Sequence, residues 1–106
     1  MRQIKFRAWI YTDLRNFMIY SKELGDFFDH KIYGFKHELM QFTGLHDKDG
    51  TEIYEGDKIQ YEAYDESEIG IVSFEDAHFM VIVDDERYSL SIYDLEYTTV
   101  IGNIYE

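Results

Sequence analysis

The segment from Asp47 to Glu52 carries carboxylates around Gly50, a composition that suggests a calcium-binding loop. If Gly50 took the invariant glycine position of an EF-hand loop, the first ligand would be Leu45 and the last would be Gly56. Neither side chain offers the oxygen that a hard cation requires. A hairpin turn with solvated carboxylates therefore explains this segment better than a calcium site does.

The other residues that could do chemistry form no recognisable catalytic pattern. His30, His37, His46 and His78 include no close pair at metal-ligand spacing, and the chain has no cysteine to complete a zinc site. None of the serines lies in a Gly-x-Ser-x-Gly turn. Carboxylates are so numerous that no acid–base pair can be singled out. The sequence therefore predicts no catalytic residues, no metal ligands and no cofactor.

Two groups of residues are candidates for an interaction surface. Lys5, Arg7 and Trp9 fall on one face of a predicted strand and form a small basic and aromatic stripe. Such a stripe can bind a nucleic-acid backbone, but here it is better explained by pairing with the acidic half of the protein or with another subunit. The second group is made of acidic residues in predicted turns: Asp65, Glu66, Glu68, Asp84, Asp85 and Glu86.

Charge is distributed unevenly along the chain. The net charge is −12, and residues 1–36 hold seven Lys and Arg against four acids, whereas residues 37–106 hold three against eighteen. A surface this negative repels nucleic acid and anionic membranes, attracts a basic partner, and keeps a protein soluble. The composition therefore argues against direct nucleic-acid and membrane binding and favours a protein partner.

Alternation of apolar and polar residues predicts mostly strands. A first strand is expected at 4–10, and a return strand at 17–20 completes a hairpin. Residues 21–33 could form a short helix or an ordered loop. Asp49-Gly50 favours a type I′ turn that joins 43–47 to 52–54.

Five short strands are expected from residue 57 onward, near 57–63, 69–74, 79–83, 87–92 and 100–105. The charged stretch 65–68 is expected to be a loop, and the apolar run 79–83 is expected to be buried on both faces. The expected class is mainly β, or β-rich α+β, with a small antiparallel barrel or bent sheet for which an SH3-like barrel is one form. Residues 1–106 are expected to form a single domain, in which 1–56 pack on the barrel of 57–106.

Three ordered blocks of sequence resemble one protein family. The opening Ile4–Trp9, the central Leu39–Asp57 and the ending Val100–Glu106 are similar to the distinctive stretches of the YopX family of phage and prophage proteins. Residues 21–37 match no motif of that family, and relatives often continue a few residues beyond Glu106. The resemblance implies a bacterial cytoplasm and a tendency to form homo-oligomers, and it supplies no catalytic residues.

The sequence leaves three functions open. The first is a non-enzymatic phage or prophage accessory protein that binds protein or assembles with itself, and the absence of an apolar signal segment fits a cytoplasmic location. The second is an acidic DNA mimic that occupies a basic site on a host nucleic-acid enzyme. The third is an enzyme that uses carboxylates, with or without a divalent metal. Aromatic residues left over on an outer face would suit a homo-oligomer.

Overall fold

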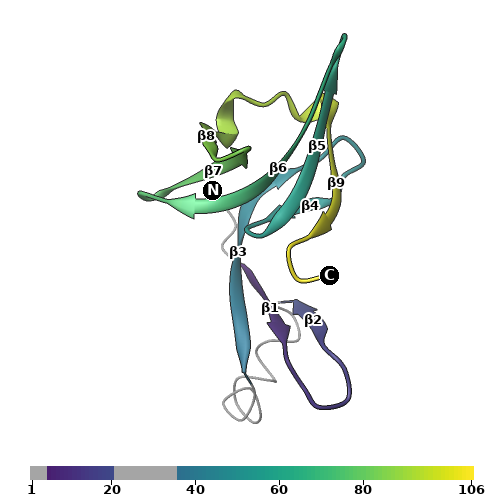
Figure 1. Ribbon diagram of the computed structural model, residues 1–106, viewed down its shortest axis with the longest axis vertical. Coiled ribbons are helices and arrows are strands. Elements are labelled where there is room, and N and C mark those ends of the chain that lie inside the picture. The colour runs from purple at the N-terminus through teal and green to yellow at the C-terminus, as the bar shows by residue number, and fades with distance from the viewer. Residues whose placement is uncertain (1–4, 21–35) are drawn as a thin grey trace. The chain divides into compact units, whose positions relative to one another are not determined.

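The computed structural model describes residues 5–20 and 36–106, and nearly all of its elements are strands (Figure 1). This confirms the mainly β class. The helix considered for residues 21–33 lies outside the described residues. The elements are β1 (Phe6–Ile10), β2 (Phe17–Tyr20), β3 (His37–His46), β4 (Glu52–Tyr54), β5 (Asp57–Ala63), β6 (Glu66–Glu75), β7 (His78–Val83), β8 (Glu86–Ser89), η2 (Leu90–Ile92), η3 (Leu95–Tyr97) and β9 (Thr98–Asn103).

The chain divides into two compact units, Met1–Phe42 and Thr43–Glu106, and β3 runs through the boundary between them. The sequence had grouped residues 43–56 with the N-terminal part. In the structure they belong to the second unit, because Ile53 of β4 is fully buried in that unit's core. That the two units pack as one domain stays a prediction.

The first unit is built on a β-hairpin, as the alternation predicted. β1 pairs antiparallel with β2, placing Ala8 opposite Ile19, and its other edge pairs antiparallel with the first half of β3. Ala8, Ile10 and Ile19 are buried and form a small core, against which Phe6 and Phe17 pack. This core is the reason why the predicted strand pair forms at these residues.

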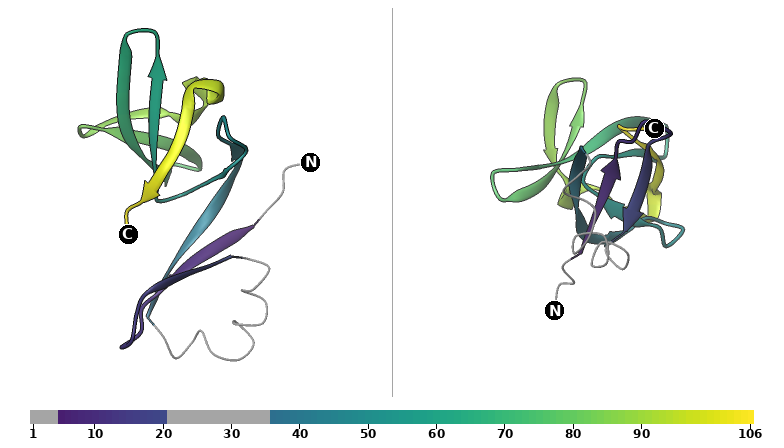
Figure 2. Two further views of the ribbon diagram at one scale, coloured as in Figure 1. Left: turned by 90° about the vertical axis from the view of Figure 1, so that its right-hand side faces the viewer. Right: turned by 90° about the horizontal axis from the view of Figure 1, so that it is seen from below.

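The second unit contains a five-stranded antiparallel sheet in the order β8-β7-β6-β5-β9. Its strands curl into a half barrel, and the β5–β6 hairpin extends beyond its neighbours (Figure 2). The curl encloses one apolar cluster, and the five strands expected from residue 57 onward are all present. The buried members of this cluster are Ile53, Ile59, Val72, Phe79, Val81 and Leu90.

Two of the hairpins in this sheet use two-residue turns with left-handed backbone at both positions. Asp76 and Ala77 have φ of 51° and 67°, and Asp84 and Asp85 have φ of 49° and 69°. This is the type I′ geometry, whose twist matches that of the paired strands. Aspartate tolerates the left-handed region better than most residues.

The turn at Asp49-Gly50 has a different geometry from the type I′ turn that was predicted. Only Gly50 has a positive φ, of 83°, and its N–H donates to the Asp47 carbonyl at 3.1 Å. This is a type I turn followed by a left-handed glycine, a common longer hairpin connection. The prediction was wrong because the Asp47 side chain accepts hydrogen bonds from Asp49 N and Thr51 N, both at 2.9 Å, and thereby fixes the turn one residue earlier.

Two strand boundaries and one burial pattern also differ from those predicted. β6 begins at Glu66, so 65–68 is not a loop, because Tyr64 and Asp65 alone complete the turn. The run 79–83 is not buried on both faces: Phe79 and Val81 are buried, and the residues that alternate with them are half-buried. Residues 90–92 form the 3-10 turn η2 rather than strand, because Ser89 caps it by accepting from Ser91 N.

Candidate functional site

Five tyrosines of the second unit gather on one side of its sheet. Three of them come from three different elements, one from the turn between β5 and β6 and one from the residue after η2, so no single element contains them. We call them the tyrosine surface: Tyr61 of β5, Tyr64 of the β5–β6 turn, Tyr88 of β8, Tyr93 directly after η2, and Tyr97 of η3.

The rings of this surface pack on one another edge to face. The ring centroids of Tyr61 and Tyr93 are 5.4 Å apart with an interplanar angle of 80°. Tyr61 and Tyr97 are 6.3 Å apart at 81°, and Tyr64 and Tyr97 are 6.3 Å apart at 42°. Edge-to-face contacts of this kind are favourable for aromatic rings. Tyr61 is therefore the centre of the surface, and its neighbours are held by η2 and η3.

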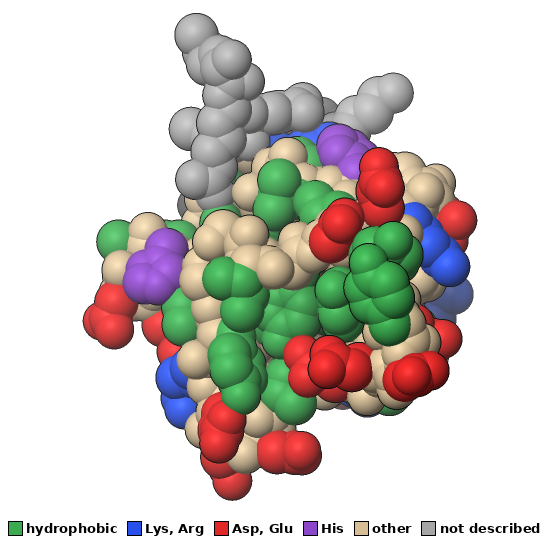
Figure 3. Space-filling view, turned by 90° about the horizontal axis from the view of Figure 1, so that it is seen from above, with side chains coloured by type: hydrophobic (Ala, Val, Ile, Leu, Met, Phe, Trp, Pro, Cys, Tyr) green, Lys and Arg blue, Asp and Glu red, His purple; other side chains and the backbone are tan. Residues whose placement is uncertain are grey.

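Carboxylates border the tyrosines and bind their hydroxyls. Tyr93 Oη donates to Glu68 Oε1 at 2.8 Å, and Tyr88 Oη donates to Glu86 Oε2 in a short hydrogen bond. Glu68 stands directly opposite Tyr61 in the β5–β6 register. In Figure 3 hydrophobic side chains, among which tyrosine is counted, gather on the viewed face with groups of Asp and Glu beside them.

These contacts raise the pKa of three of the phenols. Burial, reinforced by the hydrogen bond to Glu68, raises the pKa of Tyr93 well above its ordinary value. The bond to Glu86 is the main cause that raises the pKa of Tyr88, and burial is the main cause that raises the pKa of Tyr61. The nearby charges are negative in each case. The phenols are therefore protonated hydrogen-bond donors at neutral pH and poor nucleophiles.

Tyr64 has the least expected conformation of the five. It occupies the tip of the β5–β6 hairpin with φ of 58°, and 96% of its surface is exposed. A bulky residue in the left-handed region is uncommon, because its Cβ crowds the backbone. Its ring contacts only Tyr97 among the described aromatic rings. The fold gains little from a tyrosine at this position.

The acidic residues predicted for an interaction surface lie in two places. Glu66, Glu68 and Glu86 border the tyrosine surface, since the charges of Glu68 and Glu86 both act on Tyr88 and that of Glu66 acts on Tyr61. Asp65 follows Tyr64 in the same turn. The remaining two predicted residues, at 84 and 85, form the turn between β7 and β8.

The basic and aromatic residues predicted for the same role belong to the first unit. Lys5 Nζ lies 4.9 Å from the centroid of the Phe42 ring. Arg7 is only 4% exposed, so it offers little of its side chain to a partner, and Trp9 is half-buried. The structure therefore does not show these three residues as one exposed stripe.

Sequence reasoning did not find the tyrosine surface. Tyr61 shares one face of β5 with the core residues Ile59 and Ala63 and was counted with them. The available signal was Tyr64, a large aromatic residue beside Asp65 at a turn position where glycine or asparagine is usual. Tyr93 and Tyr97 could not be assigned to this surface, because η2 and η3 were expected to be strand and irregular chain.

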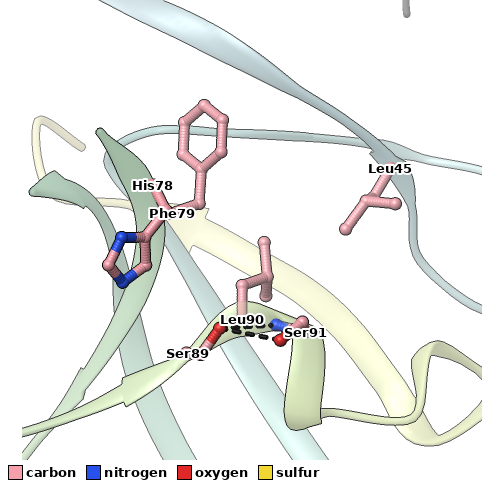
Figure 4. Close-up of a pocket in the computed structure, with 6 residues that line it drawn as sticks. All are labelled: Leu45, His78, Phe79, Ser89, Leu90 and Ser91. Atoms are coloured by element: carbon pink, nitrogen blue, oxygen red, sulfur yellow. Dashed lines mark hydrogen bonds between the residues drawn. The ribbon is translucent and has the colours of Figure 1, made fainter. Parts of the chain in front are cut away.

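A shallow cavity of about 320 Å³ lies elsewhere in the second unit. Its lining residues are Leu45, His78, Phe79, Ser89, Leu90 and Ser91 (Figure 4). Figure 4 shows the hydroxyls of Ser89 and Ser91 joined to each other, at 2.8 Å, rather than to the His78 ring. His78 Nδ1 lies 3.1 Å from the carbonyl oxygen of Asp76. The arrangement does not activate either serine as a nucleophile.

Across residues 5–20 and 36–106, no three His, Asp or Glu side chains gather closely enough to hold a metal ion. Within the same ranges, no helix is long and apolar enough to cross a membrane.

The model of the family described as YopX protein matches residues 5–106. The chain belongs to the YopX family. The YopX match includes both units and confirms the resemblance found in the three sequence blocks. The fold is similar to that in the crystal structure of protein EF1440 from Enterococcus faecalis, with a TM-score of 0.59, 23% identity, and coverage of 100% of this chain and 96% of that chain. No curated protein matches the chain.

Replacing Tyr64 by asparagine should stabilise this member of the YopX family. Asparagine adopts the left-handed region more readily than tyrosine, and Tyr64 is too exposed to lose much packing. We expect Tyr64→Asn to raise the free energy of unfolding by about 0.5–1 kcal/mol in urea titration. A clear loss of stability would show that the ring supports the fold.

Tyr93 should make the second unit sensitive to alkali. Its pKa is raised in the folded state, so its contribution to stability is complete below about pH 10, the pKa in an unfolded chain, and is lost as pH rises above that value. Between pH 9 and pH 11, Tyr93→Phe should therefore lose less thermal stability than the wild type. An equal loss in both proteins would contradict this assignment.

Proposed function

We propose that the protein is a non-enzymatic accessory protein of phage or prophage origin, and that it acts by binding another protein through the tyrosine surface. Membership of the YopX family supports the phage setting and, with it, a bacterial cytoplasm. The observation that carries the binding role is Tyr64, a strained and exposed tyrosine at the tip of a hairpin. Backbone strain of this kind persists where a function requires the side chain.

The composition of the surface also supports binding. Tyrosine is enriched in protein–protein interfaces, because a rigid ring supplies contact area while its hydroxyl supplies a hydrogen bond. Tyr88 and Tyr93 are held in place by their carboxylate partners before any partner protein arrives. A surface arranged in advance loses less conformational entropy on binding. Raised phenol pKa values favour such hydrogen bonding over nucleophilic chemistry.

A contact between two copies through this same surface is disfavoured by charge, because Glu66, Glu68 and Glu86 of one copy would face those of the other. We therefore propose that any homo-oligomer forms through other parts of the chain. Sedimentation of the wild type and of Tyr64→Asn should give the same native mass. A change of mass on substitution would identify the tyrosine surface as a self-interface.

The test is affinity capture from bacterial lysate with three baits: wild type, Tyr64→Asn and Leu14→Asn. Leu14 is the matched control, because it is also 96% exposed but lies in the first unit. The wild type and Leu14→Asn should retain a common protein that Tyr64→Asn loses. Retention of the same proteins by all three baits would overturn the proposal.

One observation favours a DNA mimic as the second candidate. Residues 43–106 hold seventeen Asp and Glu against only Lys48, Lys58 and Arg87. Binding that depends on total charge should disappear in about 0.5 M salt, because screening then acts within a few ångströms. Such binding should not respond to Tyr64→Asn, since this substitution changes no charge. Binding through the tyrosine surface should survive that salt in part and should require Tyr64.

A further inference from the structure

The tyrosine surface combines aromatic rings with carboxylates, and this combination selects the chemistry of its occupant. We propose that it binds an arginine side chain presented by a basic segment of a partner protein. This inference rests on the proposed function and names the partner's chemistry.

The carboxylates of the surface are positioned and can still accept hydrogen bonds. Glu68 accepts one bond from Tyr93, and Glu86 accepts one from Tyr88. An ionised carboxylate has about four acceptor positions, so each keeps capacity for a further donor. Both side chains are exposed, and a partner can therefore reach them. A guanidinium group is suited to this, since it donates two parallel hydrogen bonds to one carboxylate.

The rings of the surface attract cations as well. A cation within about 6 Å of an aromatic centroid is stabilised by the negative face of the ring. The described residues of the first unit show this contact three times: Lys5 over Phe42, Arg15 over Phe17 and Lys36 over Tyr11. Among the described residues, no Lys or Arg occupies a ring of the tyrosine surface in the same way.

The second unit has no cation of its own placed to neutralise this surface. Arg87 Nε pairs with Glu75 Oε1 at 2.8 Å, and Lys58 alternates along β5 with Ile59 and so points to the opposite face of the sheet. Lys48 lies in the turn between β3 and β4, beside Asp47. The carboxylates that act on Tyr61, Tyr88 and Tyr93 are Asp94, Glu66, Glu68 and Glu86, and a cationic partner would complement them.

Arginine fits better than lysine for a geometric reason. Its planar guanidinium can stack on the face of a phenol ring. At the same time it can donate hydrogen bonds, in its own plane, to Glu68 or Glu86. A lysine ammonium is compact and strongly hydrated, and it makes one of these contacts at the expense of the other. Discrimination between the two is therefore the sharpest test of the inference.

The experiment uses a short Gly/Ser peptide that carries a pair of arginines, and matched peptides with lysine or with citrulline. Binding to the full chain is followed by amide chemical shifts in NMR titrations at about 0.05 M and 0.5 M salt. We expect shifts confined to the β5–β6 turn and residues 86–97, binding of the lysine peptide about tenfold weaker, and no binding of the neutral citrulline peptide.

Two variants and two control variants test where the arginine peptide binds. Tyr64→Asn and Glu68→Gln should each weaken the arginine peptide about three- to tenfold. Leu14→Asn removes an equally exposed apolar side chain elsewhere, and Glu62→Gln removes an equal charge from the opposite face of β5, so neither should change binding. Equal affinities for arginine and lysine, or shifts spread over the whole acidic surface, would overturn the inference.

The outcomes also separate this inference from the proposed function. If Tyr64→Asn abolishes capture of a lysate protein while the arginine peptide fails to bind, the arginine inference is wrong and the binding role stands. If neither the capture nor the peptide responds to Tyr64→Asn, both are wrong.

Discussion

Asp47→Ala should destabilise the second unit by about 3 kcal/mol. The Asp47 carboxylate is only 7% exposed and accepts three backbone hydrogen bonds, from Asp49 N, Thr51 N and Val100 N, each at 2.9 Å. A hydrogen bond to a charged group contributes about 1.5–3 kcal/mol, and a buried donor left without a partner adds a penalty. Part of this loss is recovered, because the turn amides can reach water.

The bond to Val100 makes this loss more than local. It joins the turn between β3 and β4 to strand β9, across 53 residues of sequence. Urea titration measures the total loss, and hydrogen exchange should show faster exchange of the Val100 amide. Asp49→Ala is the matched control, because Asp49 is exposed and its carboxylate accepts none of these three bonds. Equal stability of the two variants would contradict the assigned role.

The same carboxylate predicts a dependence on acid. Burial would raise the pKa of Asp47, but the three backbone donors outweigh it and hold the pKa below its ordinary value of 3.8. A depressed pKa contributes stability that is complete above about pH 4 and is lost as pH falls through the folded-state value. The wild type should therefore lose more stability between pH 5 and pH 2 than Asp47→Ala does. Equal losses would show that Asp47 is not the group responsible.

Gly70→Ala should destabilise the second unit by about 2 kcal/mol or more. A Cβ atom built on Gly70 would lie 2.4 Å from Val81 Cγ1, 2.9 Å from Val83 Cγ2 and 3.2 Å from the carbonyl oxygen of Ile82. Contacts this short force side chains or backbone to move, and overpacking of a filled core costs about 1–3 kcal/mol. Denaturant titration measures the change.

A second substitution tests the cause of this effect. Val81→Ala alone should destabilise by opening a cavity, because Val81 is buried in the core of the second unit. In the double variant Gly70→Ala/Val81→Ala, the new methyl group occupies space that the valine vacated. The double variant should therefore lose less stability than the sum of the two single variants. Simple additivity would show that the close contact with Val81 is not what makes Gly70 necessary.

The strands were predictable because their signal is local. Along β7 and the first half of β5 buried residues alternate with half-buried or exposed ones, and this period of two is visible in the sequence alone. The hairpin of β1 and β2 and the five strands after residue 56 follow from it. Where the prediction failed, at the turn after Asp47 and at η2, a side chain, Asp47 or Ser89, bonded to the backbone and changed the local path.

The candidate site was predictable only in part, for the opposite reason. Glu66, Glu68 and Glu86 could be proposed because excess charge is visible in composition. That these carboxylates border five tyrosines was not visible in the sequence. Tyr61 and Tyr93 are 32 residues apart in sequence and meet only when η2 and η3 are in place. By itself, the sequence determined the β class, the positions of the strands and the family. The tertiary structure alone decided which aromatic rings share a surface with which carboxylates, because such contacts depend on strand register and curl rather than on any local pattern.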